Sequence, residues 1–299
     1  MNKKLFFAIF IFLGLTLGVI SQWPDGKFHL VMCDVGQGDA ILLSHNFSQI
    51  LIDGGPNNRV TQCLAKQMPF WDRQVELVIA THPDKDHITG LINVIERYQV
   101  TSFVSINKAN NTTVFEQLRA AVQQKQIPVH LAQKGEQLLV GDINLKVLSP
   151  EKNKENVLIW SASTETLADK QTLEVTANDS RESSNDESVV LRASFGQFDV
   201  LLTGDITSQI EKQLVDNFNL TGIEVLKVSH HGSKYSTSKD LLDELGAQVA
   251  IIGVGKNQWG HPDIEVLQRL QDFKVLTLRT DIDGEIKISS DGQAWWLEK

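Results

Sequence analysis

The sequence predicts a mixed α/β fold with β-hairpins near both ends of its folded part. Short apolar runs of strand length recur along the chain, and helical patterns separate many of them. A glycine-containing turn joins the first pair of runs, Phe28–Asp34 and Ala40–Ser44, and another joins the last pair, Glu285–Ser289 and Ala294–Leu297. Such pairs are typical of β-hairpins. The order of elements therefore differs from the regular strand–helix alternation of a doubly wound sheet.

Between the two hairpins, the apolar pattern predicts the remaining elements in order. Strands are expected at Gln49–Asp53, Leu77–Thr81, Phe103–Ile106, Val129–Leu131, Asn144–Leu148, Val189–Ser194, Phe198–Thr203, Val225–Val228, Val249–Val254 and Val275–Leu278. Helices are expected at Arg59–Met68, Phe115–Gln126, Thr207–Asn217, Asp240–Leu245 and Ile264–Gln271. A further helix follows residue 87, because apolar residues recur there at helical spacing, at Ile88, Leu91, Ile92 and Ile95.

Composition and charge narrow the class of protein. The 299 residues are 41% hydrophobic and 22% charged, which is typical of a globular protein with a sizeable core. The net charge of −9 argues against a protein that coats nucleic acid. It does not exclude an enzyme with a phosphate-containing substrate, because bound divalent cations would supply local positive charge. The two cysteines, Cys33 and Cys63, form no C-x-x-C pair, and we expect both to be buried free thiols.

Residues 1–23 have the layout of a secretory signal peptide or of an N-terminal membrane anchor. Lys3 and Lys4 precede an apolar run from Leu5 to Ile20 that contains no charge. The run is shorter than the roughly 20 residues that span a bilayer comfortably. A cleaved signal and a retained anchor therefore stay open as alternatives. In either case the two lysines place the folded part outside the cytoplasm, secreted or tethered to the membrane.

Residues 24–299 are expected to form one domain that carries a surface insertion. The segment Glu151–Glu187 is rich in Glu, Asp, Ser, Thr, Asn and Lys and has few apolar residues. This composition is typical of a long solvated segment rather than of a packed element. Because the strand pattern resumes at Val189, we place no domain boundary in this segment.

The strongest chemical signal is the loop His82-x-Asp84-x-Asp86-His87. Four side chains of metal-ligand type occur within six residues, directly after an expected strand and before an expected helix. Imidazole together with carboxylate suits zinc, and a carboxylate-rich set also suits manganese. Packed carboxylates repel one another and need a counter-charge, so an ordinary solvated loop is the weaker interpretation.

Three later stretches also place ligand-type residues at the end of a strand or in the adjoining loop. These residues are Asp205, His230, His231 and His261. A single His or Asp in such a place is more often structural, but together with the first loop they predict one composite metal site. Three other histidines have no further ligand-type residues near them in the sequence, and we interpret them as ordinary strand or surface residues. They are His29, His45 and His130.

The ligand-type stretches together resemble the successive motifs of the metallo-β-lactamase superfamily. The motifs are His82-x-Asp84-x-Asp86-His87, Thr203-Gly204-Asp205 and Ser229-His230-His231-Gly232-Ser233. Within the superfamily, the chain resembles the soluble, nuclease-like domain of ComEC-type competence proteins, which take part in DNA uptake. That likeness adds Asp34-Val35-Gly36-Gln37-Gly38-Asp39-Ala40, Ile52-Asp53-Gly54-Gly55, Gly260-His261-Pro262 and Arg279-Thr280-Asp281 with Gly284. It runs from about Phe28 to the C-terminus, except for the insertion.

The resemblance implies a four-layer αββα sandwich with one or two divalent ions, zinc or manganese, at one edge. One ion would be held by His82 and Asp84, the other by Asp86, His87 and one of His230 and His231, with Asp205 bridging. Asp53 would steady the histidine ligands from behind them. As catalytic residues, Asp86 would orient the attacking water, and His231 or His261 would assist the developing charge.

Two departures from the superfamily pattern bear on the choice of metal. Asp84 stands where the commoner pattern has a histidine. The additional ligand histidine expected between the first loop and Asp205 is not evident, and Asn185-Asp186-Glu187-Ser188 occupies that region. Two interpretations stay open: the first metal site binds its ion weakly, or it prefers a harder ion than zinc. The large membrane channel of the competence proteins has no counterpart in this sequence, so DNA import would require association with a separate uptake channel.

The function implied is hydrolysis by metal-activated water. The leading substrate is a phosphodiester, and single-stranded DNA outside the cytoplasm is the leading example. Two alternatives stay open. The same kind of site can hydrolyse an amide, a lactam or a thioester, and a chain of this class can also act as a non-catalytic, extracellular DNA-binding accessory protein.

Overall fold

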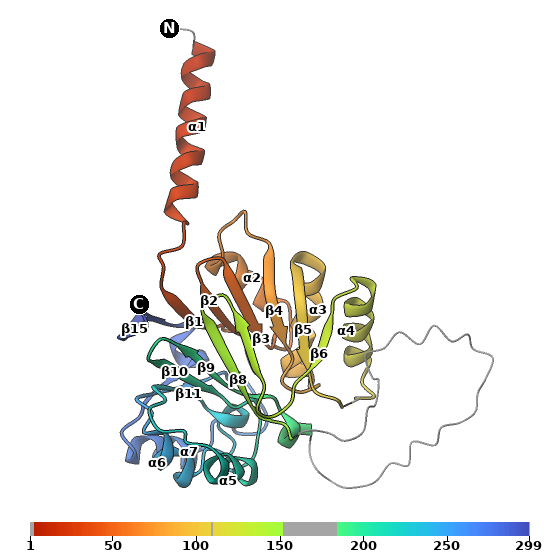
Figure 1. The fold of residues 1–299 in the computed structure, drawn as a ribbon, viewed down its shortest axis with the longest axis vertical. Coiled ribbons are helices and arrows are strands. Elements are labelled where there is room, and N and C mark those ends of the chain that lie inside the picture. Colours follow the sequence, from red (N-terminus) through yellow and green to blue (C-terminus); the bar gives the residue numbers. More distant parts are fainter. Residues whose placement is uncertain (1–2, 109, 152–183, 299) are drawn as a thin grey trace, which may run out of the picture.

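The computed structural model describes residues 3–108, 110–151 and 184–298 and contains two β-sheets (Figure 1). The eight-stranded sheet has the order β15 (Trp295–Glu298), β14 (Ile286–Ser290), β1 (Phe28–Met32), β2 (Ile41–His45), β3 (Ser48–Ile52), β4 (Gln74–Ile79), β5 (Gln99–Ser105), β6 (Val129–Leu131). The seven-stranded sheet has the order β13 (Leu276–Arg279), β12 (Val249–Ile252), β11 (Val225–Lys227), β10 (Phe198–Leu202), β9 (Val190–Phe195), β8 (Ile143–Ser149), β7 (Gln137–Val140).

Helices cover the outer face of each sheet. The eight-stranded sheet is covered by α2 (Arg59–Gln67), α3 (Lys85–Arg97) and α4 (Thr113–Gln124), and the other sheet by α5 (Ser208–Asn217), α6 (Lys239–Leu245) and α7 (Ile264–Asp272). Short helical turns occur at η1 (Ser184–Glu187), η2 (Ser229–Gly232) and α8 (Thr280–Asp283). The structure thus has four layers in the order helix, sheet, sheet, helix, which confirms the fold predicted from the motifs.

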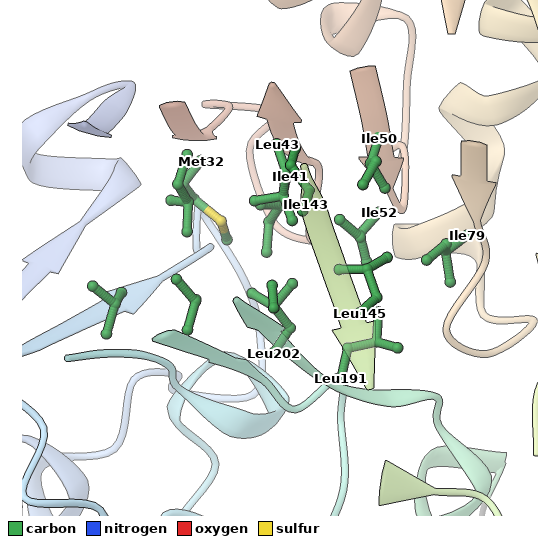
Figure 2. Close-up of a cluster of buried hydrophobic side chains, with 14 of the residues drawn as sticks. Met32, Ile41, Leu43, Ile50, Ile52, Ile79, Ile143, Leu145, Leu191 and Leu202 are labelled. Carbon is green, nitrogen blue, oxygen red and sulfur yellow. The ribbon is translucent and has the colours of Figure 1, made fainter. Parts of the chain in front are cut away.

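The two sheets bury a common core, part of which Figure 2 shows. Met32, Ile41 and Ile52 of the first sheet face Leu145 and Leu202 of the second. Successive side chains of a strand point to opposite faces, so the alternate residues pack against the helices instead. Burial on both faces explains why the strands are nearly continuous apolar runs in the sequence.

Parallel strands bring loops from both sheets to one edge of the sandwich. In the first sheet β3 pairs in parallel with β4, and β4 with β5. In the second, β10 pairs in parallel with β11, and β11 with β12. The carboxyl ends of these strands lead into the ligand-type residues that the sequence singled out.

Several differences from the sequence prediction lie in short or polar segments. Strand β7 was not predicted, since Gln137–Val140 is short and half-exposed, and neither was α8.

Of the expected insertion at 151–187, residues 152–183 lie outside the described residues, and Ser184–Glu187 form η1. The N-terminal run forms α1 (Lys3–Ser21), which extends from the body in Figure 1. Among the described residues, no helix has the length and apolar character needed to cross a membrane.

The prediction of two free thiols is wrong, because Cys33 and Cys63 form a disulfide. Cys33 follows β1 with its side chain facing the outer helices, and Cys63 lies on the buried face of α2. Their Cα atoms are 5.9 Å apart, although 30 positions separate them in the sequence. Only the packing of α2 on the first sheet brings the two sulfur atoms together.

We expect loss of this disulfide to lower the free energy of unfolding by about 3 kcal/mol, because the bridge constrains a loop of this length in the unfolded chain. The change is Cys33→Ser with Cys63→Ser, and urea denaturation measures it. Dithiothreitol should lower the stability of the native protein by a similar amount and leave the double variant unaffected. Two titratable thiols in the denatured, unreduced protein would show that the bridge is absent.

Candidate metal centre

Five of the predicted metal ligands lie close together at the edge of the sandwich to which the parallel strands of both sheets lead. They are His82, Asp86, His87, Asp205 and His231. Four compact groups of potential ligands occur among the described residues, each with its ligand atoms within 4.8 Å of one another. The groups share members and draw on Asp39, Asp53, His82, Asp86, His87, Asp205 and His231. The first sheet and its loops supply most of these residues, and the second sheet supplies Asp205 and His231.

Asp53 lies behind His87, in the place that the resemblance implied for it. Its Oδ2 accepts a hydrogen bond of 2.7 Å from His87 Nδ1, and also accepts one from the Thr81 hydroxyl. Its Oδ1 accepts from the backbone N–H of Thr81 at 2.8 Å. Since Nδ1 must carry the proton in this contact, Asp53 fixes the His87 tautomer and turns Nε2 toward the other ligand-type residues.

Side chains from both sheets surround His87 Nε2. Asp205 Oδ2 lies 3.2 Å from His87 Nε2, and His231 Nε2 lies 3.3 Å from the same His87 nitrogen. Asp86 Oδ2 lies 3.4 Å from His231 Nε2. His231 Nδ1 donates to the backbone oxygen of Gly253 at 2.8 Å, so its Nε2 also faces the centre. These side chains form the half of the site that the family resemblance assigned to one ion.

His82 and Asp84 form the other half, with Asp205 between the halves. His82 Nε2 lies 3.8 Å from Asp84 Oδ2 and 3.9 Å from Asp205 Oδ2. Both distances are too long for hydrogen bonds. Within the part of the chain that the structure describes, His82 Nε2 is buried and has no hydrogen-bond partner. Asp205 therefore has the place expected of a bridging ligand.

His230 and His261 lie further out. The ring of His230 is 6.3 Å from that of His231 and 5.6 Å from that of His261, centroid to centroid. Burial lowers the pKa of both side chains, so both favour the neutral form. The amide of Asn185 lies 3.3 Å from His230 Nε2, in the region where the superfamily pattern led us to look for a further histidine. Of the adjacent pair, His231 is thus the one placed among the inner ligand-type residues.

Two further residues belong to the site although the sequence motifs did not indicate them, Asp39 and Lys227. Both are fully buried, and the Lys227 ammonium forms ion pairs with Asp39 and with Asp205 Oδ1. It also donates to the backbone oxygen of Gly204 at 2.7 Å. A lysine inside the apolar strand β11 was the available signal, because an unpaired lysine is almost never buried.

A glycine explains how Asp39 approaches the centre. A Cβ on Gly38 would lie 2.1 Å from the backbone oxygen of Asp86, and Gly38 has a φ of 130°. Asp39 N donates to that same oxygen at 3.3 Å. The G-x-G at residues 36–38, interpreted from sequence as a turn, therefore lets this loop pack against the start of α3.

The buried carboxylates of the centre need positive charge beside them to stay ionised. Burial disfavours ionised Asp205, but His231, His87 and Lys227 outweigh it and hold the pKa of Asp205 well below its usual range. Burial likewise disfavours charged His87 and His231, yet the carboxylates of Asp205, Asp53 and Asp39 raise the pKa of both histidines well above the usual value. The pKa of His82 is lowered to about 4, mainly by burial and secondly by the charge of nearby His87.

These residues fit a divalent cation. Two protonated imidazoles whose Nε2 atoms are 3.3 Å apart repel each other, whereas a metal ion would supply the same positive charge and leave both Nε2 atoms as donors of lone pairs. The unpartnered Nε2 of buried His82 provides a further such donor. Imidazole nitrogens mixed with carboxylate oxygens are ligands for zinc, manganese or iron.

Comparison with known proteins agrees with this geometry. A profile described as the metallo-β-lactamase superfamily matches residues 33–176. Over this region the chain is similar to the metallo-β-lactamase superfamily. Its motif loop His82–His87 lies inside the matched region, and the αββα layers are those of that fold.

Among relatives of this metallo-β-lactamase-fold chain are bacterial competence proteins. ComE operon protein 3 of Bacillus subtilis is 29% identical over 86% of this chain and 32% of its own length. Recombination protein 2 of Haemophilus influenzae is 28% identical over 93% of this chain and 31% of its own length. Competence protein ComA of Neisseria gonorrhoeae is 34% identical over 34% of this chain. The chain spans about one third of the length of the first two relatives.

Solved structures support the fold. The metallo-β-lactamase fold protein YhfI from Bacillus subtilis covers 91% of this chain with a TM-score of 0.51 and 11% identity, and all of that chain is matched. CmlA, a diiron β-hydroxylase from Streptomyces venezuelae, covers 89% of this chain with a TM-score of 0.54 and 14% identity, over 54% of its own length. At these identities the likeness extends to the fold alone.

We expect Lys227→Met to lower the free energy of unfolding by about 3–5 kcal/mol, because it leaves two buried carboxylates without their shared cation. Adding Asp39→Asn should recover part of the loss, since one of those charges is then removed. Urea denaturation of the metal-free proteins measures both effects. Lys239→Met, at the exposed start of α6, is the matched control and should change stability by about 0.5 kcal/mol or less. Equal stability of Lys227→Met and wild type would contradict the role of this ion-pair group.

Proposed function

We propose that this protein is a metal-dependent phosphodiesterase that acts on single-stranded DNA outside the cytoplasm. The observation that supports hydrolysis is the clustering of imidazole and carboxylate groups around Asp205 at an edge where both sheets end. They form groups of three in which the ligand atoms lie within 4.8 Å of one another. The relatives named for competence and recombination support a nucleic acid as substrate.

The protein side chains would hold up to two ions and orient the reactants. His82 and Asp84 would hold one ion, Asp86, His87 and His231 the other, and Asp205 both. A divalent cation in such a site supplies activation of water and stabilisation of negative charge. The hydrogen bonds of His87 Nδ1 to Asp53 and of His231 Nδ1 to Gly253 keep both rings in the orientation that binding requires.

Roles in the chemistry follow from position. Asp86 is the more exposed carboxylate beside His231 and would orient the attacking water from the open side. His261, near His230, is half-buried and has an Nδ1 without a hydrogen-bond partner among the described residues, so it would donate a hydrogen bond to the developing charge. His231 is held between Asp205 and Gly253, which favours a ligand role over proton transfer.

The first catalytic test is Asp205→Asn. This nearly isosteric change removes the shared negative charge, and we expect turnover of single-stranded DNA and of a phosphodiester dye to fall by at least about 100-fold. Elemental analysis should find less bound metal. Manganese should support wild-type activity at least as well as zinc, because the ligand set is rich in carboxylates.

The control is His130→Ala, which removes a half-exposed ring paired with Glu136 and should leave turnover unchanged. A well-folded, metal-loaded Asp205→Asn protein with wild-type turnover would refute the proposal. Turnover of a chromogenic lactam, amide or thioester without phosphodiester turnover would favour the second type of hydrolase. DNA binding with no turnover of any substrate would favour a non-catalytic accessory protein.

We also propose that residues after the N-terminal segment are exported, either secreted or tethered by residues 1–23. Lys3 and Lys4 precede the apolar run, as in exported proteins. The disulfide Cys33–Cys63 supports this, because disulfides persist in oxidising compartments and are rare in the cytosol. Aromatic rings near the base of α1 support a retained tether, since Trp23 packs on Phe47 and Phe70 packs on Trp71. In this setting the protein would process DNA for a separate uptake channel.

A topology measurement tests the export proposal. Alkaline phosphatase fused after Lys299 should be active, because its own disulfides form only outside the cytoplasm. A reporter that is active only in the cytoplasm should be inactive at the same junction. The reverse pattern would refute export, and the size of the exported protein distinguishes a cleaved signal from a tether.

A further inference from the structure

A groove beside the candidate metal centre is lined by basic and aromatic side chains that metal binding does not require. Its volume is about 780 Å³, and Asp84 and Asp86 of the centre line it together with Arg59, Lys85, Lys256 and Trp259. The groove thus joins the metal-binding carboxylates to three basic side chains and an indole. It is formed by the loop that follows β1, by the loops that begin α2, α3 and α4, and by the loop that follows β12.

Trp259 is unusual for a tryptophan, because 68% of it is exposed. Its ring is nearly parallel to that of His261, with an interplanar angle of 19° and a centroid separation of 6.5 Å. His261 in turn lies beside His230, next to the inner ligands. An exposed aromatic face that borders a catalytic groove provides a surface on which a planar ring can stack.

The loop that carries Trp259 is fixed rather than left to solvent. Asn257 Oδ1 accepts hydrogen bonds from the backbone N–H groups of Trp259 and His261, at 3.1 and 3.0 Å. Asn257 Nδ2 donates to the backbone oxygens of Gly255 and His261. Gly255 N donates to the side chain of Gln37, which also lines the groove. The backbone that carries the indole is therefore held in place before any ligand arrives, which limits the loop entropy lost on binding.

The charges of the groove favour a polyanion. Lys85 and Lys256 are exposed, and among the described residues neither forms an ion pair, whereas Arg59 pairs with Asp34 at 2.7 Å. These cations stand out in a chain whose net charge is −9. A backbone of phosphates would be attracted to them, and only unpaired bases would have a free face for the indole.

We propose that this groove is a subsite for single-stranded nucleic acid, in which one base stacks on Trp259 while Lys85 and Lys256 contact flanking phosphates. This inference rests on the proposed function and adds its substrate specificity. A duplex hides its base faces and would lose the stacking contact, so the groove selects unpaired strands. Trp259 is then a specificity-determining residue for the phosphodiester reaction.

Equilibrium binding tests the subsite without relying on turnover. The full chain in mild detergent is titrated with a phosphorothioate-linked oligothymidylate, which resists hydrolysis, and with an abasic strand of the same length and linkages. Trp259→Ala should weaken oligothymidylate binding about 5- to 150-fold. It should leave binding of the abasic strand unchanged, and Trp259→Phe should restore most of the affinity. Trp23→Ala is the matched control, because Trp23 is also largely exposed but lies at the base of α1.

Salt dependence tests the two lysines. Each phosphate contact that is lost should reduce the slope of log affinity against log salt by about 0.7. Lys85→Gln with Lys256→Gln should therefore reduce the slope by about 1.4 for both the oligothymidylate and the abasic strand.

The outcomes separate this inference from the proposed hydrolysis. If the wild type binds oligothymidylate through Trp259 but cleaves no phosphodiester, hydrolysis fails and the subsite stands. If the wild type cleaves DNA but Trp259→Ala binds and cleaves it equally well, the subsite is overturned and hydrolysis stands. Equal wild-type affinity for duplex DNA or for inorganic polyphosphate would also overturn the subsite, because charge alone would then explain binding.

Discussion

The burial of Asp205 is the constraint on which the site depends. A carboxylate that is 3% exposed cannot remain ionised without cations around it, and here those cations come from both sheets. Lys227 binds one of its oxygens, and His87 and His231 approach the other. Asp205 consequently ties the two halves of the sandwich together electrostatically, in the same place where a shared metal ligand is needed.

This constraint links stability to function. The residues that surround Asp205 follow strands of two different sheets, so they come together only after the apolar faces of those sheets have packed. Burial of the apolar strands provides the stabilisation that offsets the cost of placing charges in the interior. Bound metal would return part of that cost by replacing repulsion between like groups with coordination bonds.

The centre and its groove differ in physical character. The centre is buried and its side chains are fixed by hydrogen bonds to Asp53, Gly253 and Thr81. The groove is open, and its cations are long side chains on the surface. A rigid buried centre suits chemistry that needs fixed geometry, and an open charged groove suits a substrate longer than the site itself.

The sequence by itself determined the fold class, the positions of most strands and helices, and the motif residues that converge at the edge. Apolar runs of strand length and ligand-type residues at their ends are local signals, and local signals can be read from one chain. It did not identify the disulfide, because Cys33 and Cys63 are 30 positions apart and only the packing of α2 joins them. It also missed Asp39, Lys227 and the Trp259 groove, and it left His230 and His231 as alternatives. Those features depend on which side chains face each other across two sheets, and that is decided by tertiary packing, since partners distant in the sequence set the charge and the space around each residue.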